Sequence, residues 1–376
     1  LFRCMNHIIK YIHAREILDS RGNPTLEVEI TTDAGFSGRA AIPSGASTGI
    51  WEAVEQRDGD NRFHGKGLKK AIKGIYEEIF PALKGMPVTQ QKEIDYKMIE
   101  LDGTEYKSRL GGNTLLGVSV AAAKTAAAAE KKPLYEYINK DSNLLPVPFF
   151  NVINGGMHAG NPLDFQEFMI APTGAESFHE ALRMGSEIYQ QLKSDLKKQY
   201  GKDSTNVGDE GGFSPTMKTP EEALDMILAA ADEIGYIDET VLAIDVAANS
   251  FYKENGVYSF KGKDTTAGEL IDIYKELVEK YPIKSIEDLL EEKEHMGFAE
   301  ATKALPIQIG GGDLFVTNKK RLQKGIDMGA CNALLWKVNQ RPDDDHCAVE
   351  ESHSRLHRLQ STVEHHVHQR RHSGVV

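Results

Sequence analysis

A short apolar run with a carboxylate near its end is the feature that most constrains this chain. Residues 241–247 are predicted to form a strand buried on both faces, because four of the five residues before Val246 are apolar. Asp245 lies near the C-terminal end of this run, where a buried and unpaired carboxylate is costly. The side chain therefore needs a cation, a hydrogen-bond network or water.

Two later runs repeat this pattern of a charged group at the end of a core strand. Residues 283–288 end in two acids, and residues 333–338 carry Lys337 inside an apolar run. Charged groups at the ends of successive strands indicate a site at the mouth of an α/β barrel. A plainer interpretation stays open, in which each carboxylate is a core residue paired with a lysine.

Length and composition narrow the classes of protein. A chain of 376 residues is long enough for two domains, and its net charge of −12 argues against nucleic acid or an anionic membrane surface as the main partner. No apolar run approaches the roughly 18 to 20 residues that span a bilayer. Cys4, Cys331 and Cys347 make neither a disulfide framework nor a zinc pattern. We therefore expect a cytoplasmic protein.

The first part of the chain, residues 1–143, is predicted to be an α+β domain. Residues 8–18 and 25–30 favour a hairpin, residues 36–42 a further strand, and residues 65–139 helices, the clearest of which covers 116–130. The connection at 43–49 holds three hydroxyls and two glycines. It is either a mobile surface loop or a lid whose hydroxyls and amides close over an anionic substrate.

From residue 144 to residue 340, short apolar runs alternate with helical segments, which predicts a parallel α/β sheet or barrel. The six predicted strands cover residues 147–153, 165–170, 241–247, 283–287, 306–309 and 332–338, and the clearest helices cover 176–200, 220–234 and 267–280. Residues 341–376 are rich in His and Arg and contain no strand-like run. We expect this tail to be disordered.

Several side chains near the predicted strand ends suit metal and proton chemistry. Asp245 and Glu287 are oxygen ligands on different strands, which favours Mg²⁺ over zinc. Lys337 in an apolar strand would have a lowered pKa and serve as a base near neutral pH. Together they suit removal of a weakly acidic proton next to a carboxylate, with the metal stabilising the dianion that results.

Three further proton-active residues can be interpreted either as functional or as purely structural. Glu210 lies in a loop dense in glycine and acid, while His158 and Glu167 follow or begin predicted strands. Each could act as an acid, a base or a substrate contact. Each could equally be structural, since turn glycines are common in such loops and a lone histidine is more often structural than catalytic.

Residues 5–340 resemble enolase, the glycolytic phosphopyruvate hydratase. The resemblance rests on eight motifs in the family's order, at residues 14–24, 44–49, 154–160, 165–172, 206–215, 244–248, 285–288 and 334–340. It implies an N-terminal α+β domain followed by a TIM-like barrel, here with about six of eight strands. It also implies an Mg²⁺-dependent hydro-lyase that converts 2-phosphoglycerate to phosphoenolpyruvate, and a cytoplasmic homodimer. The use of a Lys or His base with Mg²⁺ is a general feature of that superfamily.

The resemblance also implies a role for each of several residues. Lys337 matches the base that removes the C2 proton of the substrate. Glu210 matches the acid that assists departure of the C3 hydroxyl, with Glu167 beside it. His158 matches a histidine that contacts the substrate. Ser47 matches the lid serine that contacts the substrate and helps to bind a second Mg²⁺.

The metal ligands implied by the resemblance are Asp245 and Glu287, two of three carboxylates that hold the first Mg²⁺. The third belongs where this chain has Gly312, and Asp313 beside it matches the next residue of the family's segment, a neighbour of the catalytic Lys. The resemblance ends near Gln340, after which the sequence resembles an out-of-frame translation or an altered gene end. Two functions therefore stay open: an active hydro-lyase, or a catalytically inactive enolase-like protein that binds or dimerises.

Overall fold

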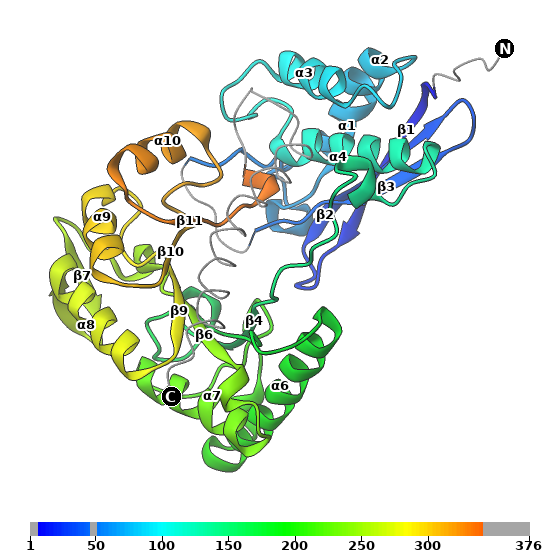
Figure 1. Cartoon of the computed structure of the whole chain (residues 1–376). Coiled ribbons are helices and arrows are strands. Elements are labelled where there is room, and N and C mark those ends of the chain that lie inside the picture. Colours follow the sequence, from blue (N-terminus) through cyan, green and yellow to red (C-terminus); the bar gives the residue numbers. More distant parts are fainter. Residues whose placement is uncertain (1–6, 46–50, 341–376) are drawn as a thin grey trace. The chain divides into compact units, whose positions relative to one another are not determined.

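A computed structural model describes residues 7–45 and 51–340 of the chain (Figure 1). The chain divides into two compact units. The first comprises Leu1–Leu144, Val316–Asn318 and Trp336–Val376, and the second comprises Leu145–Phe315 and Lys319–Leu335. Ser47 and the expected disordered tail lie outside the described residues. Within the described part of the chain, no helix combines the length and the apolar character needed to cross a membrane.

The first unit is built on an antiparallel sheet of three strands in the order β1-β2-β3, which confirms the predicted hairpin. The strands are β1 (Ile9–Leu18), β2 (Pro24–Thr32) and β3 (Ser37–Ala41). Leu26, Val28 and Ile30 alternate along β2 and are fully buried. Their period of two places them on one face of the sheet, against which the helices pack.

The rest of the unit is helical, as predicted, and α4 (Gly112–Ala129) packs against β2 and β3. The other helices are α1 (Lys69–Gly74), the π-helical turn η2 (Ile75–Ile79), α2 (Phe80–Leu83), α3 (Gln91–Asp102) and α5 (Leu134–Ile138). The Ala-rich α4 approaches the sheet closely because its residues are small. A Cβ at Gly117 would lie 2.7 Å from Val28 Cγ2, so only glycine fits at that contact.

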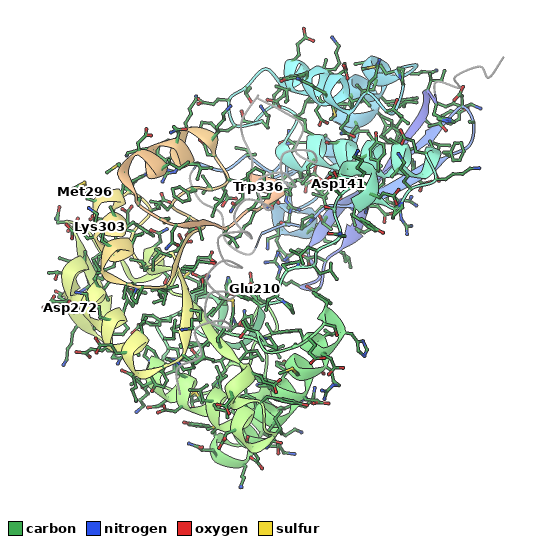
Figure 2. All side chains as sticks on the ribbon, viewed as in Figure 1. Asp141, Glu210, Asp272, Met296, Lys303 and Trp336 are labelled. Atoms are coloured by element: carbon green, nitrogen blue, oxygen red, sulfur yellow. The ribbon has the colours of Figure 1, made fainter. Side chains whose placement is uncertain are left out.

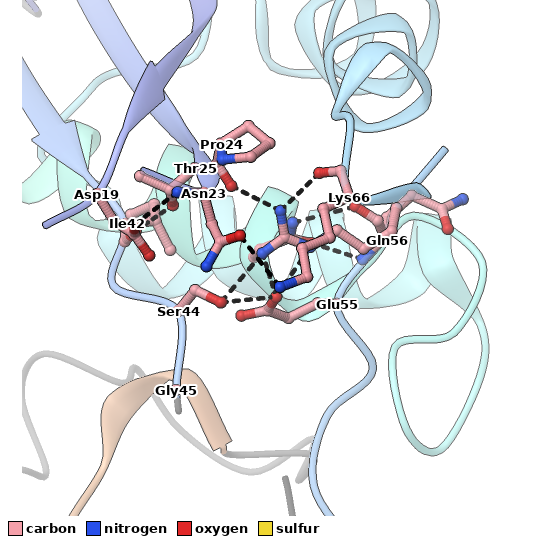
Figure 3. Close-up of polar contacts among 12 residues, drawn as sticks. Asp19, Asn23, Pro24, Thr25, Ile42, Ser44, Gly45, Glu55, Gln56 and Lys66 are labelled. Atoms are coloured by element: carbon pink, nitrogen blue, oxygen red, sulfur yellow. Dashed lines mark hydrogen bonds and ion pairs between the residues drawn. The ribbon is translucent and has the colours of Figure 1, made fainter. Parts of the chain in front are cut away.

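Two arginines hold the segment that leads out of β3 (Figure 3). The guanidinium of Arg57 donates hydrogen bonds to the Pro24 carbonyl at 2.6 Å, to Ser44 Oγ at 3.0 Å and to Glu55 Oε2 at 2.7 Å. Arg21 donates to the Ser44 carbonyl at 2.9 Å. The first residues of the predicted loop at 43–49 are therefore fixed on the sheet, while residues 46–50 lie outside the described part.

The second unit contains a six-stranded sheet in the order β11-β10-β9-β6-β5-β4. Its strands are β4 (Phe150–Asn154), β5 (Glu167–Ala171), β6 (Val241–Asp245), β9 (Ile283–Glu287), β10 (Gln308–Gly311) and β11 (Ala333–Leu334). A separate hairpin, which the sequence reasoning missed, joins β7 (Val257–Phe260) to β8 (Lys263–Thr266). Within the described residues β4 and β11 are the two ends of this strand order, and β4 is bridged further only to Phe213, so the sheet forms part of a barrel and is not closed.

The expectation of a wholly parallel sheet is wrong for the first strands. β5 runs antiparallel to both β4 and β6, whereas β6, β9, β10 and β11 are parallel. No helix long enough for a parallel crossover separates β4 from β5. Two helices separate β5 from β6, so the chain returns to the end of the sheet where β5 finished, and Ala171 pairs with Val241.

Helices lie along the outer side of this sheet (Figure 1). They are α6 (Phe178–Tyr200), α7 (Pro220–Glu233), α8 (Ala267–Lys280), α9 (His295–Ala304) and α10 (Lys319–Met328). The predicted start of α7 is confirmed, because Thr219 accepts from the Glu222 amide and Pro220 occupies the first turn. Exposed side chains such as Asp272 on α8 and Lys303 on α9 point away from the sheet (Figure 2).

The predicted strand at 332–338 is mostly wrong. Only Ala333–Leu334 pair with β10, and the Leu335 amide then donates to the Gly311 carbonyl at 3.1 Å. Residues 336–340 belong to the first unit and include the short helix η7 (Val338–Gln340). Lys337 is therefore half-buried after the strand rather than enclosed within it.

Candidate active site

Three carboxylates meet where β6 and β9 end in the second unit. Asp245 is the last residue of β6, Glu287 is the last residue of β9, and the two pair directly across the parallel strands. Asp288 follows Glu287. One carboxylate oxygen from each of the three lies within 4.8 Å of the others. Parallel pairing in register thus brings together the two acids that the sequence singled out.

Asp245 is buried, with 7% of its surface exposed. Its Oδ1 accepts a hydrogen bond from the Ala247 amide at 2.9 Å, and its Oδ2 accepts one from Gln166 Nε2 at 3.2 Å. Burial raises the pKa of Asp245 well above its usual range, and the charges of Glu287 and Asp288 raise it further. A bound cation would reverse both effects, because it stabilises the ionised carboxylates.

Asp288 is the acid that the sequence reasoning did not assign. Its backbone is in the left-handed region at φ 43°, and its side chain reaches the loop after β10. Oδ1 accepts from the Gly312 amide at 3.0 Å, and Oδ2 accepts from the Asp313 amide at 2.7 Å. Burial, and then the charge of Asp313, raise the pKa of Asp288 to about 7 although these amides oppose the shift.

Gly312 faces the same cluster. A Cβ at this position would lie 2.5 Å from Glu287 Oε1 and 2.6 Å from Asp288 Oδ2. Any side chain at residue 312 would therefore point into the carboxylates, and glycine leaves that space to Glu287 and Asp288. Asp313 is turned elsewhere, since its Oδ2 accepts from Asn249 Nδ2 at 3.0 Å.

The donor set fits a hard divalent cation. Carboxylate oxygens are the ligands that Mg²⁺ and Ca²⁺ prefer, and neither histidine nor cysteine belongs to this group. The space that a Cβ at Gly312 would fill lies directly against two of the three carboxylates. The residues present therefore fit the Mg²⁺ expected from the sequence.

A second group joins His158, Glu167 and Glu210, whose ligand atoms also lie within 4.8 Å of one another. His158 Nδ1 is 3.5 Å from Glu167 Oε1, and its Nε2 is 3.9 Å from Glu210 Oε1. Burial alone would lower the pKa of His158, but the carboxylates of Glu167 and Glu210 outweigh it and raise that pKa. The two groups lie side by side in the sheet, because Glu167 on β5 pairs with Asp245 on β6.

The loop that carries Glu210 is held against β4 by backbone contacts. The Asn154 amide donates to the Phe213 carbonyl at 2.8 Å, and the Phe213 amide donates to the Val152 carbonyl at 2.9 Å. Tyr189 of α6 stacks on Phe213 at 4.3 Å between ring centroids and donates its hydroxyl hydrogen to the Gly211 carbonyl. The half-exposed Glu210 side chain is thus presented from a well-supported turn (Figure 2).

Lys337 is the one described candidate that falls in the first unit. Its amide donates to Thr317 Oγ1 at 2.9 Å, and Thr317 Oγ1 also donates to Gln340 Oε1 at 3.3 Å. Gln340 Nε2 in turn donates to Glu52 Oε1 at 2.9 Å. The segment from Lys337 to Gln340 is therefore held in the first unit by hydrogen bonds at both of these residues.

Comparison with known proteins decides the family. The model described as "Enolase, N-terminal domain" matches residues 9–138, and the one described as "Enolase, C-terminal TIM barrel domain" matches residues 142–346. The chain belongs to the enolase family. Among its curated relatives, the enolase of Methanocaldococcus jannaschii is 56% identical over 333 residues, which cover 88% of this chain and 78% of the relative. The enolase of Thermococcus gammatolerans is 56% identical over 338 residues, with the same coverage of each chain.

These comparisons confirm the resemblance to enolase and the fold class, an N-terminal domain followed by a TIM-type barrel domain. They also confirm the enzyme class, since enolases are lyases of the phosphopyruvate hydratase type. Nothing in them supports the alternative of an inactive binding protein. Among the seven residues assigned from the sequence, the structure brings together Asp245 with Glu287, and His158 with Glu167 and Glu210.

Proposed function

We propose that this enolase-family chain dehydrates 2-phosphoglycerate to phosphoenolpyruvate in glycolysis, with Mg²⁺ as its cofactor. The observation that carries the proposal is the pairing of two groups on neighbouring strands. A cluster of hard carboxylate oxygens on β6 and β9 lies next to a proton-active trio, His158, Glu167 and Glu210, because β5 and β6 pair in register. Dehydration next to a carboxylate needs both kinds of group.

Asp245 and Glu287 are the residues that hold Mg²⁺ in this proposal. Asp245 is oriented by Gln166 and by the Ala247 amide, so its carboxylate is preorganised. When bound, the cation supplies positive charge for the substrate carboxylate, whose negative charge grows as the C2 proton leaves. Ser47, by its resemblance to the lid serine of the family, is proposed to contact the substrate and help to bind a second Mg²⁺.

Glu210 is the proposed acid for departure of the C3 hydroxyl, and Glu167 supports it. His158 lies between the two carboxylates, at 3.5 and 3.9 Å, and their charges favour its protonated form. A protonated His158 supplies a positive group for the anionic substrate. Lys337 is proposed as the base that removes the C2 proton, an assignment that rests on its place in the family motif at 334–340.

The proposal extends to the setting of the enzyme. Family membership favours a cytoplasmic homodimer, and the net charge of −12 disfavours nucleic acid and anionic membranes as partners. The substrate is then 2-phosphoglycerate, and the products are phosphoenolpyruvate and water.

Formation of phosphoenolpyruvate by the purified chain tests the function, followed by ultraviolet absorbance with excess Mg²⁺ or with a chelator. We expect product only with Mg²⁺. Glu210→Gln removes the acid and should lower kcat by about 100-fold or more. Glu180→Gln, an exposed change on α6, is the matched control and should leave kcat unchanged. Absence of product at every Mg²⁺ concentration would refute the proposal.

A further inference from the structure

The acidic cluster contains one carboxylate more than the two that the family motifs assign. Asp288 is 4% exposed, and one of its oxygens lies within 4.8 Å of ligand oxygens from both Asp245 and Glu287. Across from it stands Gly312, where a side chain would have entered the same space. These two observations belong together, because the space that residue 312 leaves empty is bordered by the Asp288 carboxylate.

We propose that Asp288 supplies the third carboxylate of the Mg²⁺ site in this chain, in the place that a side chain at residue 312 would take. The inference rests on the proposed function, since it concerns the same Mg²⁺. It assigns a ligand to a residue that the sequence motifs leave without a role. It also gives Gly312 a role, which is to keep that space clear.

The alternative third ligand, Asp313, is less suited by its contacts. Asp313 is half-buried, and its Oδ2 already accepts a hydrogen bond from Asn249 Nδ2 at 3.0 Å. No oxygen of Asp313 belongs to the group that lies within 4.8 Å. Reaching the cluster would cost that hydrogen bond and a change of rotamer, whereas Asp288 is already there.

Asp288 also has capacity for a metal beside its backbone contacts. Its oxygens accept three amide hydrogens, from Gly312, Asp313 and Leu314 at 3.0, 2.7 and 3.4 Å. A carboxylate has about four lone-pair positions, so about one remains for a cation. The three amides hold the side chain in place as supporting contacts commonly do for metal ligands.

The geometry makes Asp288 and a side chain at 312 competitors. A Cβ at 312 would lie 2.5 Å from Glu287 Oε1 and 2.6 Å from Asp288 Oδ2, and both distances are closer than real Cβ contacts allow. A carboxylate introduced at 312 would therefore crowd both side chains and compete with Asp288 for the place of the third ligand instead of adding a fourth acid. The effects of changing the two residues should consequently be strongly non-additive.

Calorimetric titration of the full chain with Mg²⁺, and with Mn²⁺ followed by electron paramagnetic resonance, tests this independently of turnover. Asp288→Asn should weaken binding about tenfold or more, since affinity follows the charge and number of ligands. Asp313→Asn is the matched control, because it also removes one carboxylate charge close to the cluster. It should change the Mg²⁺ affinity by less than about threefold. In the Gly312→Asp background, Asp288→Asn should cost less than about threefold.

Each outcome decides a different point. If the unchanged chain binds neither cation, the proposed function fails. If it binds and Asp288→Asn binds equally well, or if Asp313→Asn weakens binding as much, the assignment of Asp288 is overturned while the function stands. If Asp288→Asn does not fold, the Mg²⁺ affinity of Gly312→Asp relative to the unchanged chain decides. If Asp288 is a ligand, the new carboxylate only replaces it, and affinity changes by less than about threefold. A gain of tenfold or more shows that Asp288 was not a ligand.

Discussion

His158 shows how the charge state of one residue follows from its neighbours. The residue is 6% exposed, and neither ring nitrogen has a hydrogen-bond partner within normal distance. The carboxylates of Glu167 and Glu210 stand 3.5 and 3.9 Å away. Burial disfavours the imidazolium, and the two acids favour it more strongly, so the pKa of His158 is raised.

Glu167→Gln should therefore lower the pKa of His158, because it removes one of the two charges that raise it. Nuclear magnetic resonance of the imidazole carbons would follow the titration midpoint. His295 is an internal control: its pKa is lowered, first by burial, and its midpoint should not move. A raised pKa means that protonated His158 stabilises the fold below its ordinary value near 6.5, and that this stability is lost as pH rises through the raised value. An unchanged midpoint in Glu167→Gln would contradict the assigned pairing.

At the residue scale, the sequence predicts the acids that end strands and misses the one held by a distant loop. Asp245 and Glu287 stand out because each ends an apolar run. The Asp288 carboxylate is held by the amides of residues 312–314, which lie 24 to 26 residues further along the chain. No local sequence pattern indicates such a contact. The apolar neighbours of Lys337 predict a strand, but a run of that composition does not show where sheet pairing stops.

At the scale of elements, the loop after η4 (Lys202–Thr205) shows why glycine is required at two positions near the site. A Cβ at Gly208 would lie 2.4 Å from the His158 carbonyl oxygen, and one at Gly212 would lie 2.7 Å from Asn154 Oδ1. The loop can lie on the end of β4 only because both Cβ atoms are missing. That close approach sets the position of Glu210 relative to His158.

Gly208→Ala should therefore lower both stability and activity. The new Cβ meets backbone, which cannot rotate away, so we expect a loss of about 1–3 kcal/mol in the free energy of unfolding. Gly160→Ala is the matched control, because nothing lies within 4 Å of a Cβ there. It should be neutral or slightly stabilising. Denaturant unfolding measures both, and equal midpoints for the two variants would show that the loop yields without strain.

The elements themselves were largely predictable, and their directions were not. The predicted helices at 176–200, 220–234 and 267–280 differ from α6, α7 and α8 by two residues or fewer at each end. Period and capping residues are local signals, so the sequence contains them. The antiparallel direction of β5 was not predictable in this way. It depends on the path of the connections between the strands, and the sequence of a strand does not contain that information.

At the scale of the whole molecule, several acids lie close together in the second unit of a chain whose net charge is already −12. Asp245, Glu287 and Asp288 share one cluster, and Glu167 and Asp313 contribute further negative charge to Asp245. Without a cation, the folded state must either keep protons on these groups or bear their repulsion. The stability of the molecule is thereby linked to pH and, through the proposed Mg²⁺ site, to Mg²⁺.

The linkage has a definite sign for Asp288, whose pKa rises from an ordinary value of 3.8 to about 7. Below about pH 4 the group is protonated in the folded and the unfolded chain alike. Between about pH 4 and 7 the unfolded chain loses the proton first, so the stability that protonation gives the metal-free protein is lost across this window. In the proposed site Mg²⁺ would bind the ionised carboxylates, and it would have to displace fewer protons from them as the pH rises.

Mg²⁺ should consequently raise the melting temperature more at pH 8 than at pH 5.5. A ligand present at 100 times its dissociation constant adds about 2.7 kcal/mol to the free energy of unfolding, and proton competition reduces this at the lower pH. Thermal melts with excess Mg²⁺ or with a chelator, at matched ionic strength in NaCl, measure the difference. Glu287→Gln should remove most of it. Equal shifts at both pH values, or an undiminished shift in Glu287→Gln, would mean that the cation acts elsewhere on this acidic chain.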